Sequence, residues 1–250
     1  MDMKRYFLEL AYNGSKYHGW QIQNNAVTVQ EEIEKALSLL LGIPTGIIGS
    51  GRTDTGVHAS QQFAHFDAPE IADRNSLLKK LNGILGKSIA IYEIKEVVPD
   101  AHARFDAIER EYLYKCRLRK SPFDHEGSWL LFQNPDIDQM NKAAALLLEY
   151  EDFECFSKVK TEVNNFRCEI KSAFWEQNGH ELFFHITANR FLRGMVRAIV
   201  GTLMEVGVGK INPDDFRSII ESKNRRKAKA AAPAQGLYLC RVSYPDRIFK

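Results

Sequence analysis

Apolar and polar side chains alternate in some stretches of this chain and recur every three to four residues in others. Alternation is typical of strands, and the longer spacing is typical of helices that bury one face. In the first half, this pattern predicts strands at residues 5–12, 47–48, 61–66 and 89–98, and helices at 28–42 and 76–85. Thr28 and Glu31 have the spacing of a capping box at the start of the first helix.

The second half repeats this succession of strands and helices less regularly. It predicts strands at 111–118, 167–177, 181–188 and 237–244, and helices at 136–148, at 190–206 and after Asn212 and Pro213. Asn178 and Gly179 are a strong signal for a two-residue hairpin turn. The two β-α-β-β-like halves, residues 1–104 and 105–250, predict an α+β fold. With no visible linker between them, we expect them to share one continuous mixed, mainly antiparallel sheet with helices packed on it.

The composition is that of an ordinary globular protein, with 44% hydrophobic residues, 26% charged residues and a net charge of +2. No apolar run reaches the roughly 20 residues of a membrane span, and the chain starts without the apolar segment of a secretory signal. The scattered cysteines form no C-x-x-C pair, which argues against a zinc site and for a reducing, cytoplasmic location: Cys116, Cys155, Cys168 and Cys240. The small net charge does not by itself suggest nucleic acid, so an RNA ligand requires positive charge gathered on one face.

The clearest candidate for chemistry is the loop at residues 51–59, Gly-Arg-Thr-Asp-Thr-Gly-Val-His-Ala. Asp54 stands between two glycines, which let a ligand approach the backbone, and two residues after Arg52, which favours its ionised form. A carboxylate presented in this way suits attack on a bound substrate. The pattern alone more often belongs to a glycine-bounded loop in which the aspartate closes a turn.

These nine residues resemble the catalytic loop of the TruA-type tRNA pseudouridine synthases. Further blocks are similar to motifs of that family, in the same order and across nearly the whole chain: residues 12–23, 101–107, 110–114, 191–203 and 232–239. The resemblance implies the pseudouridine synthase fold and a cytoplasmic homodimer that shares one tRNA. It also implies an isomerase that converts uridine to pseudouridine at positions 38, 39 and 40 of the anticodon stem-loop.

This isomerisation breaks the glycosidic bond, turns the base over and removes a proton from C5. There is no net oxidation or reduction, so we expect no cofactor. The resemblance makes Asp54 the catalytic residue, as nucleophile or as base, and it pairs Arg197 with that carboxylate. It also makes Tyr112 the platform on which the flipped uridine stacks. Without the family pattern, Arg197 reads as a solvated helix residue, and Tyr112 and Tyr114 read as one buried strand face.

Two sets of residues remain less defined. Arg52 is the other candidate partner of Asp54, or it contacts RNA instead. Arg225, Arg226 and Lys227 lie in the densest basic cluster, which is either a tRNA backbone contact or a solvated surface. No set of histidines, cysteines and carboxylates has metal-ligand spacing. The competing hypotheses are an RNA-binding module without catalysis, which the intact site residues disfavour, and a metal-dependent RNA hydrolase, which the missing ligand set disfavours.

Overall fold

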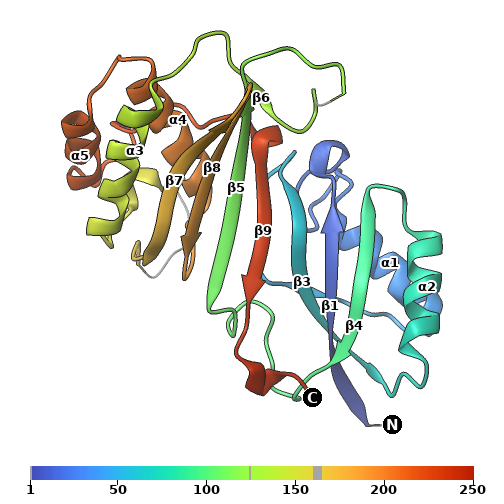
Figure 1. The fold of residues 1–250 in the computed structure, drawn as a ribbon. Coiled ribbons are helices and arrows are strands. Elements are labelled where there is room, and N and C mark those ends of the chain that lie inside the picture. The colour runs from blue at the N-terminus through green and yellow to red at the C-terminus, as the bar shows by residue number, and fades with distance from the viewer. Residues whose placement is uncertain (1, 124, 160–164) are drawn as a thin grey trace. The chain divides into compact units, whose positions relative to one another are not determined.

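A computed structural model describes residues 2–123, 125–159 and 165–250 (Figure 1). In this part of the chain, nine strands form a mixed sheet and five α-helices pack on it, which confirms the predicted α+β class. The chain divides into two compact units. The first is Met1–Ile108 with Leu239–Lys250, and the second is Glu109–Tyr238. The predicted division at 104/105 lies four residues from the change of unit, and the last residues group with the first unit.

The first unit is built on a central strand with partners on both sides. Its elements are β1 (Met3–Tyr12), η1 (Gly14–Lys16), α1 (Val29–Leu41), β2 (Ile48–Gly49), β3 (His58–Pro69), α2 (Arg74–Ile84), β4 (Ile89–Glu96), most of β9 (Leu237–Ser243) and η5 (Asp246–Ile248). The strand order is β4-β1-β3-β9, with β2 beside β3. Strand β1 is antiparallel to both neighbours and pairs its fully buried Leu8 with Ala64 and Ile94. Helices α1 and α2 lie together on one side of these strands (Figure 1).

Helix α1 shows how the sequence fixes these bounds. The Thr28 hydroxyl accepts a hydrogen bond from the backbone N–H of Glu31 at 3.4 Å, as expected for an N-cap. The Glu31 carboxylate pairs with Lys35, one turn later, at 2.6 Å. Helix α1 therefore has the Thr28 N-cap bond, whereas Glu31 does not make the return bond to Thr28 that the predicted capping box requires. Gly42 ends the helix in the left-handed conformation, with φ of 71°.

The second unit has a smaller antiparallel core covered by three helices. Its elements are β5 (Glu109–Arg117), β6 (Trp129–Leu130), α3 (Ile137–Leu146), η2 (Leu147–Glu149), η3 (Glu154–Phe156), β7 (Ile170–Asn178), β8 (Glu181–Ala188), α4 (Met195–Gly207), α5 (Pro213–Glu221) and η4 (Ala234–Gly236). The strand order is β5-β8-β7, and β6 runs parallel to β5. Helix α3 packs on β7 and against α4 and α5 (Figure 1).

In this unit, the start of α4 and the turn between β7 and β8 differ from those predicted. Helix α4 begins at Met195 and not at residue 190, because Gly194 before it is left-handed, with φ of 71°. Arg193 therefore precedes the helix and does not lie one turn before Arg197 on its surface. In the hairpin, Asn178 still pairs with Glu181, and the left-handed residue is Gly179, with φ of 59°. The two-residue turn is therefore Gly179 and His180, one position later than expected.

Within the described residues, every helix is too short or too polar to cross a bilayer.

The first unit contains a buried histidine that resists protonation. His65 on β3 is 4% exposed, and its Nδ1 accepts the N–H of Ala103 at 3.1 Å. Burial, followed by the nearby charges of Arg5 and His102, lowers the pKa of His65 to about 4, against a smaller opposing effect of neighbouring carboxylates. The neutral ring is therefore part of the folded state.

We expect acid to destabilise the fold through this residue. The unfolded chain binds a proton at His65 near pH 6.5, whereas the folded chain does so only near pH 4, so this contribution to stability falls as the pH drops between these values. The loss between pH 7 and pH 5 is about 2 kcal/mol. Urea unfolding at the two pH values measures the free energy of unfolding. In His65→Gln this free energy should not show the loss. The exposed His180→Gln serves as the control, and equal pH dependence in all three proteins contradicts the prediction.

Candidate active site

Asp54 lies in the loop that joins β2 to β3, and a tight turn follows it directly. The backbone N–H of Val57 donates to the carbonyl of Asp54 at 3.1 Å, which closes a four-residue turn. Gly56 is its third residue and has φ of 78°, a conformation that favours glycine there. Asp54 is half-buried, while Arg52 and Thr55 on either side are exposed. The second glycine of the motif is thus required by the turn.

Buried polar groups of β3 hold the start of this loop. The Ser50 hydroxyl lies 2.6 Å from Oε1 of Gln62, and Nε2 of Gln62 donates to the carbonyl of Gly51 at 3.0 Å. Gln62 is fully buried, on the same face of the strand as Phe66. Gln62 is not among the site residues predicted from the sequence. The available signal was a glutamine at an inward position of an alternating strand, where a buried amide needs partners.

Tyr112 and Tyr114 of β5 have different environments. Tyr114 is fully buried, and its hydroxyl donates to the carbonyl of Pro233 at 2.7 Å. Burial raises the pKa of Tyr114, so its phenol stays protonated. Tyr112 is half-buried, with Phe191 edge-on to its ring at 5.1 Å between centroids. Tyr114 is therefore a core residue, and Tyr112 is the more accessible of the two.

Arg197 belongs to the first turn of α4 and is bound to the chain segment before β9. Its Nε donates to the carbonyl of Ala232 at 2.7 Å, and its own carbonyl accepts the N–H of Ala232 at 2.9 Å. Gly201, one turn later, allows this approach, because a Cβ there would collide with the carbonyl of Ala230. Arg197 is half-buried and anchored, which contradicts its interpretation as a solvated helix residue.

The predicted site residues are divided between the two units. Residues 232 and 233 accept hydrogen bonds from Arg197 and Tyr114, which fixes α4 relative to β5 within the second unit. Arg52 and Asp54 share one loop of the first unit. Asp54 and Arg197 belong to different units, and their pairing stays a prediction.

The basic cluster is less uniform than its sequence indicates. Nη1 of Arg225 donates to the carbonyls of Ala228 at 3.3 Å and Lys229 at 3.2 Å, so this arginine braces its own loop. Arg226 and Lys227 are exposed. These two residues are therefore the better candidates for contact with a polyanion.

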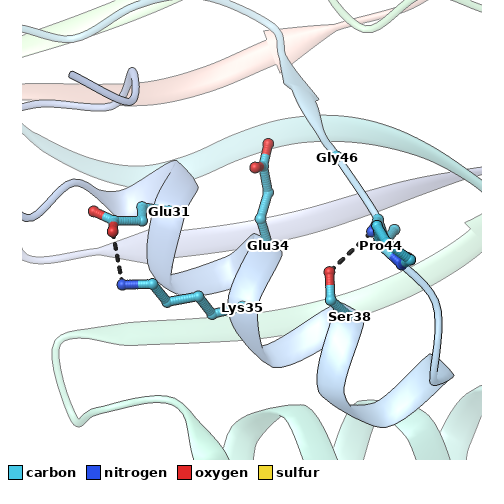
Figure 2. A pocket seen from close by; sticks show the side chains of 7 residues that line it. Glu31, Glu34, Lys35, Ser38, Pro44 and Gly46 are labelled. Carbon is cyan, nitrogen blue, oxygen red and sulfur yellow. Dashed lines mark hydrogen bonds and ion pairs between the residues drawn. The ribbon is translucent and has the colours of Figure 1, made fainter. Parts of the chain in front are cut away.

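A surface hollow of about 520 Å³ in the first unit contains none of the predicted site residues (Figure 2). It lies between α1 and the residues after it, where Glu31 faces Lys35 (Figure 2). The Ser38 hydroxyl there accepts the N–H of Thr45 at 2.9 Å. These groups bond to one another within α1 or to the segment that follows it, so among the described residues they form no polar set directed at a ligand. Among the described residues, no three histidines, cysteines or carboxylates gather in a way that would hold a metal ion.

Comparison with known proteins gives this arrangement its context. A family profile described as tRNA pseudouridine synthase matches residues 143–245. A protein of Parabacteroides distasonis called tRNA pseudouridine synthase A is 50% identical, over 99% of this chain and 98% of its own length. Proteins with the same name are 48% identical in Bacteroides fragilis, over the full length of both chains, and 38% identical in Thermoanaerobacter pseudethanolicus, over 97% of this chain and all of the relative.

Identity at this level along the whole chain defines the class as an isomerase that acts on tRNA. Within that class, the chain belongs to the TruA-type family of tRNA pseudouridine synthases.

Proposed function

We propose that this chain converts uridine to pseudouridine at positions 38, 39 and 40 of the tRNA anticodon stem-loop, with Asp54 as its one catalytic aspartate. The observation that carries the proposal is the placement of Asp54, half-buried at the start of a turn whose neighbours Arg52 and Thr55 are exposed. A carboxylate in this position is fixed through its main chain and is not enclosed by the core. It suits nucleophilic attack or proton abstraction on a substrate brought to the loop.

The other residues take supporting roles. Arg197 pairs with the Asp54 carboxylate, and its bond to Ala232 holds its side chain in place for that purpose. Tyr112 offers its ring to the flipped uridine, since a base within a stem is otherwise out of reach. Arg52 is exposed beside Asp54 and contacts either the carboxylate or an RNA phosphate.

We also propose that the protein acts as a cytoplasmic homodimer. The dimer rests on the family resemblance alone. The location is supported by the four scattered cysteines, which form no C-x-x-C pair and suit a reducing compartment. Burial raises the pKa of Cys155 to about 12 and that of Cys168 to about 11, so both thiols stay protonated and unreactive at neutral pH.

The direct test is incubation with unmodified tRNA, followed by carbodiimide treatment and mapping of reverse-transcription stops. We expect stops at positions 38 to 40, their loss from tRNAs that carry cytidine there, and equal rates with and without EDTA. Binding without stops would indicate an RNA-binding module, and strand cleavage would indicate a hydrolase. Inactivation by EDTA that one divalent ion reverses would contradict cofactor-free chemistry.

Neutralising the exposed basic pair should weaken tRNA binding in a salt-dependent way. Each lost phosphate contact reduces the log–log salt slope by about 0.7–0.9, so Arg226→Gln/Lys227→Gln should reduce it by about 1.4–1.8. Adding Arg225→Gln should destabilise the loop as well, because its carbonyl contacts are lost. Affinity measured across a salt series gives the slope. Lys79→Gln/Lys80→Gln, an exposed pair on α2, is the control, and an unchanged slope in the first variant makes the cluster a solvated surface.

A further inference from the structure

The chain segment after β1 wraps around the loop that carries Asp54. The N–H of Trp20 donates to the carbonyl of Thr53 at 3.2 Å, and the N–H of Gly56 donates to the carbonyl of Tyr17 at 3.4 Å. These two backbone bonds lie on either side of Asp54 along the chain. The resemblance gives this N-terminal segment no role, and the contacts of the segment show that it supports the loop.

Two glycines make this close packing possible. A Cβ on Gly19, whose φ is 90°, would lie 2.5 Å from the carbonyl oxygen of Thr53 and 3.2 Å from the carbonyl carbon of Asp54. A Cβ on Gly14 would collide with the carbonyl of Val57. The segment therefore packs against the main chain on both sides of Asp54 along the chain, and positions 14 and 19 have no space for a side chain.

One side-chain contact completes this support. The hydroxyl of Tyr12 lies 2.8 Å from Oγ1 of Thr53, the residue directly before Asp54. Tyr12 is 4% exposed and is the last residue of β1, where it pairs with both Ala59 and Ile89. A side chain fixed between two strands thus holds a loop residue that has no strand partner of its own.

We propose that Tyr12 is a positioning residue for the reaction, which holds Thr53 and thereby the orientation of the Asp54 carboxylate. This inference rests on the proposed function. Catalytic groups must be held within about 0.5 Å of their productive geometry, and a displacement of 1 Å costs on the order of 10²-fold in rate. The backbone bonds from Trp20 and Gly56 keep the loop in place, while the pair of hydroxyl groups restricts the rotation that remains next to Asp54.

The test separates rate from binding and from stability. Tyr12→Phe and Thr53→Val each remove one hydroxyl and keep the shape of the side chain. We expect kcat to fall about 10- to 100-fold in each, with KM for tRNA nearly unchanged. Thr53→Ser keeps Oγ and should restore most of kcat. The double variant should be no slower than either single variant, because both remove the same contact.

A matched control lies on the same strand. Tyr6 is 1% exposed, and its hydroxyl accepts the N–H of Ile71 at 3.0 Å, so Tyr6→Phe also removes a hydrogen bond of a buried tyrosine. It should lower Tm as much as Tyr12→Phe does and leave kcat unchanged. If kcat of Tyr12→Phe and Thr53→Val equals that of the wild type, or falls only in step with Tm, the inference is overturned while the proposed function stands. Absence of pseudouridine from the wild-type reaction overturns both.

Discussion

Asp54→Asn should abolish pseudouridine formation while tRNA affinity stays nearly unchanged. The amide has the size of the carboxylate, but it is neither a nucleophile nor a base, so we expect a loss of more than about 10³-fold. The backbone bonds of Thr53, Asp54 and Gly56 do not use the Asp54 carboxylate, so the variant retains them. The side-chain contacts of Tyr12 and Gln62 with the loop are also retained. Its fold should therefore be intact, and the loss should appear in turnover only.

Single-turnover assays with radiolabelled tRNA, together with filter binding, measure both quantities. Asp100→Asn is the control, because it makes the same chemical change at an exposed carboxylate of the same unit and should react at the wild-type rate. Turnover by Asp54→Asn above background would refute the assignment of Asp54.

Replacing Tyr112 should separate stacking from proton transfer. Tyr112→Ala removes the ring and its hydroxyl, and the lost stacking alone amounts to about 1–3 kcal/mol. Tyr112→Phe keeps the ring and removes only the hydroxyl. If this hydroxyl relays the C5 proton, the variant should lose about 10²–10⁴-fold in rate. We expect large losses in both, with the phenylalanine variant able to begin glycosidic cleavage and unable to complete it.

Tyr114→Phe is the control for this pair. It removes the bond to Pro233 from a fully buried ring, so it should lower stability by about 1 kcal/mol and leave the chemical step unchanged. Rates for product formation and for uracil detachment, followed separately, distinguish the two roles of Tyr112. A wild-type rate for Tyr112→Ala would place Tyr112 among the strand residues without a function in catalysis.

The order of strands and helices was largely predictable, because the periodicity of apolar residues reports which side chains face the core. The predictions are wrong where a single residue sets the boundary of an element. Gly194 delays α4 by five residues through a left-handed conformation that no periodicity reveals. The turn at Gly179 differs by one position, because strand pairing extends through Asn178.

The candidate site was predictable where it depends on local sequence and not where it depends on distant contacts. The loop around Asp54 carries its glycines and arginine within nine residues. The supports of that loop come from elsewhere in the chain, such as Tyr12, which reaches Thr53 across 41 positions, and the buried amide of Gln62. Hydrogen bonds between residues so far apart follow from the packing of strands, which one sequence does not specify residue by residue.

The segment at Ala232 and Pro233 offers only main-chain atoms to Arg197 and Tyr114. Every amino acid has the same backbone carbonyl, so these hydrogen bonds depend on the register of the segment more than on the identity of its residues. In a mutational library, small substitutions at these two positions should often remain functional, whereas inserting or deleting one residue between Ala230 and β9 should shift both acceptors at once. The block at residues 232–239 would then matter through its length, measured from the point where Ala230 packs against Gly201.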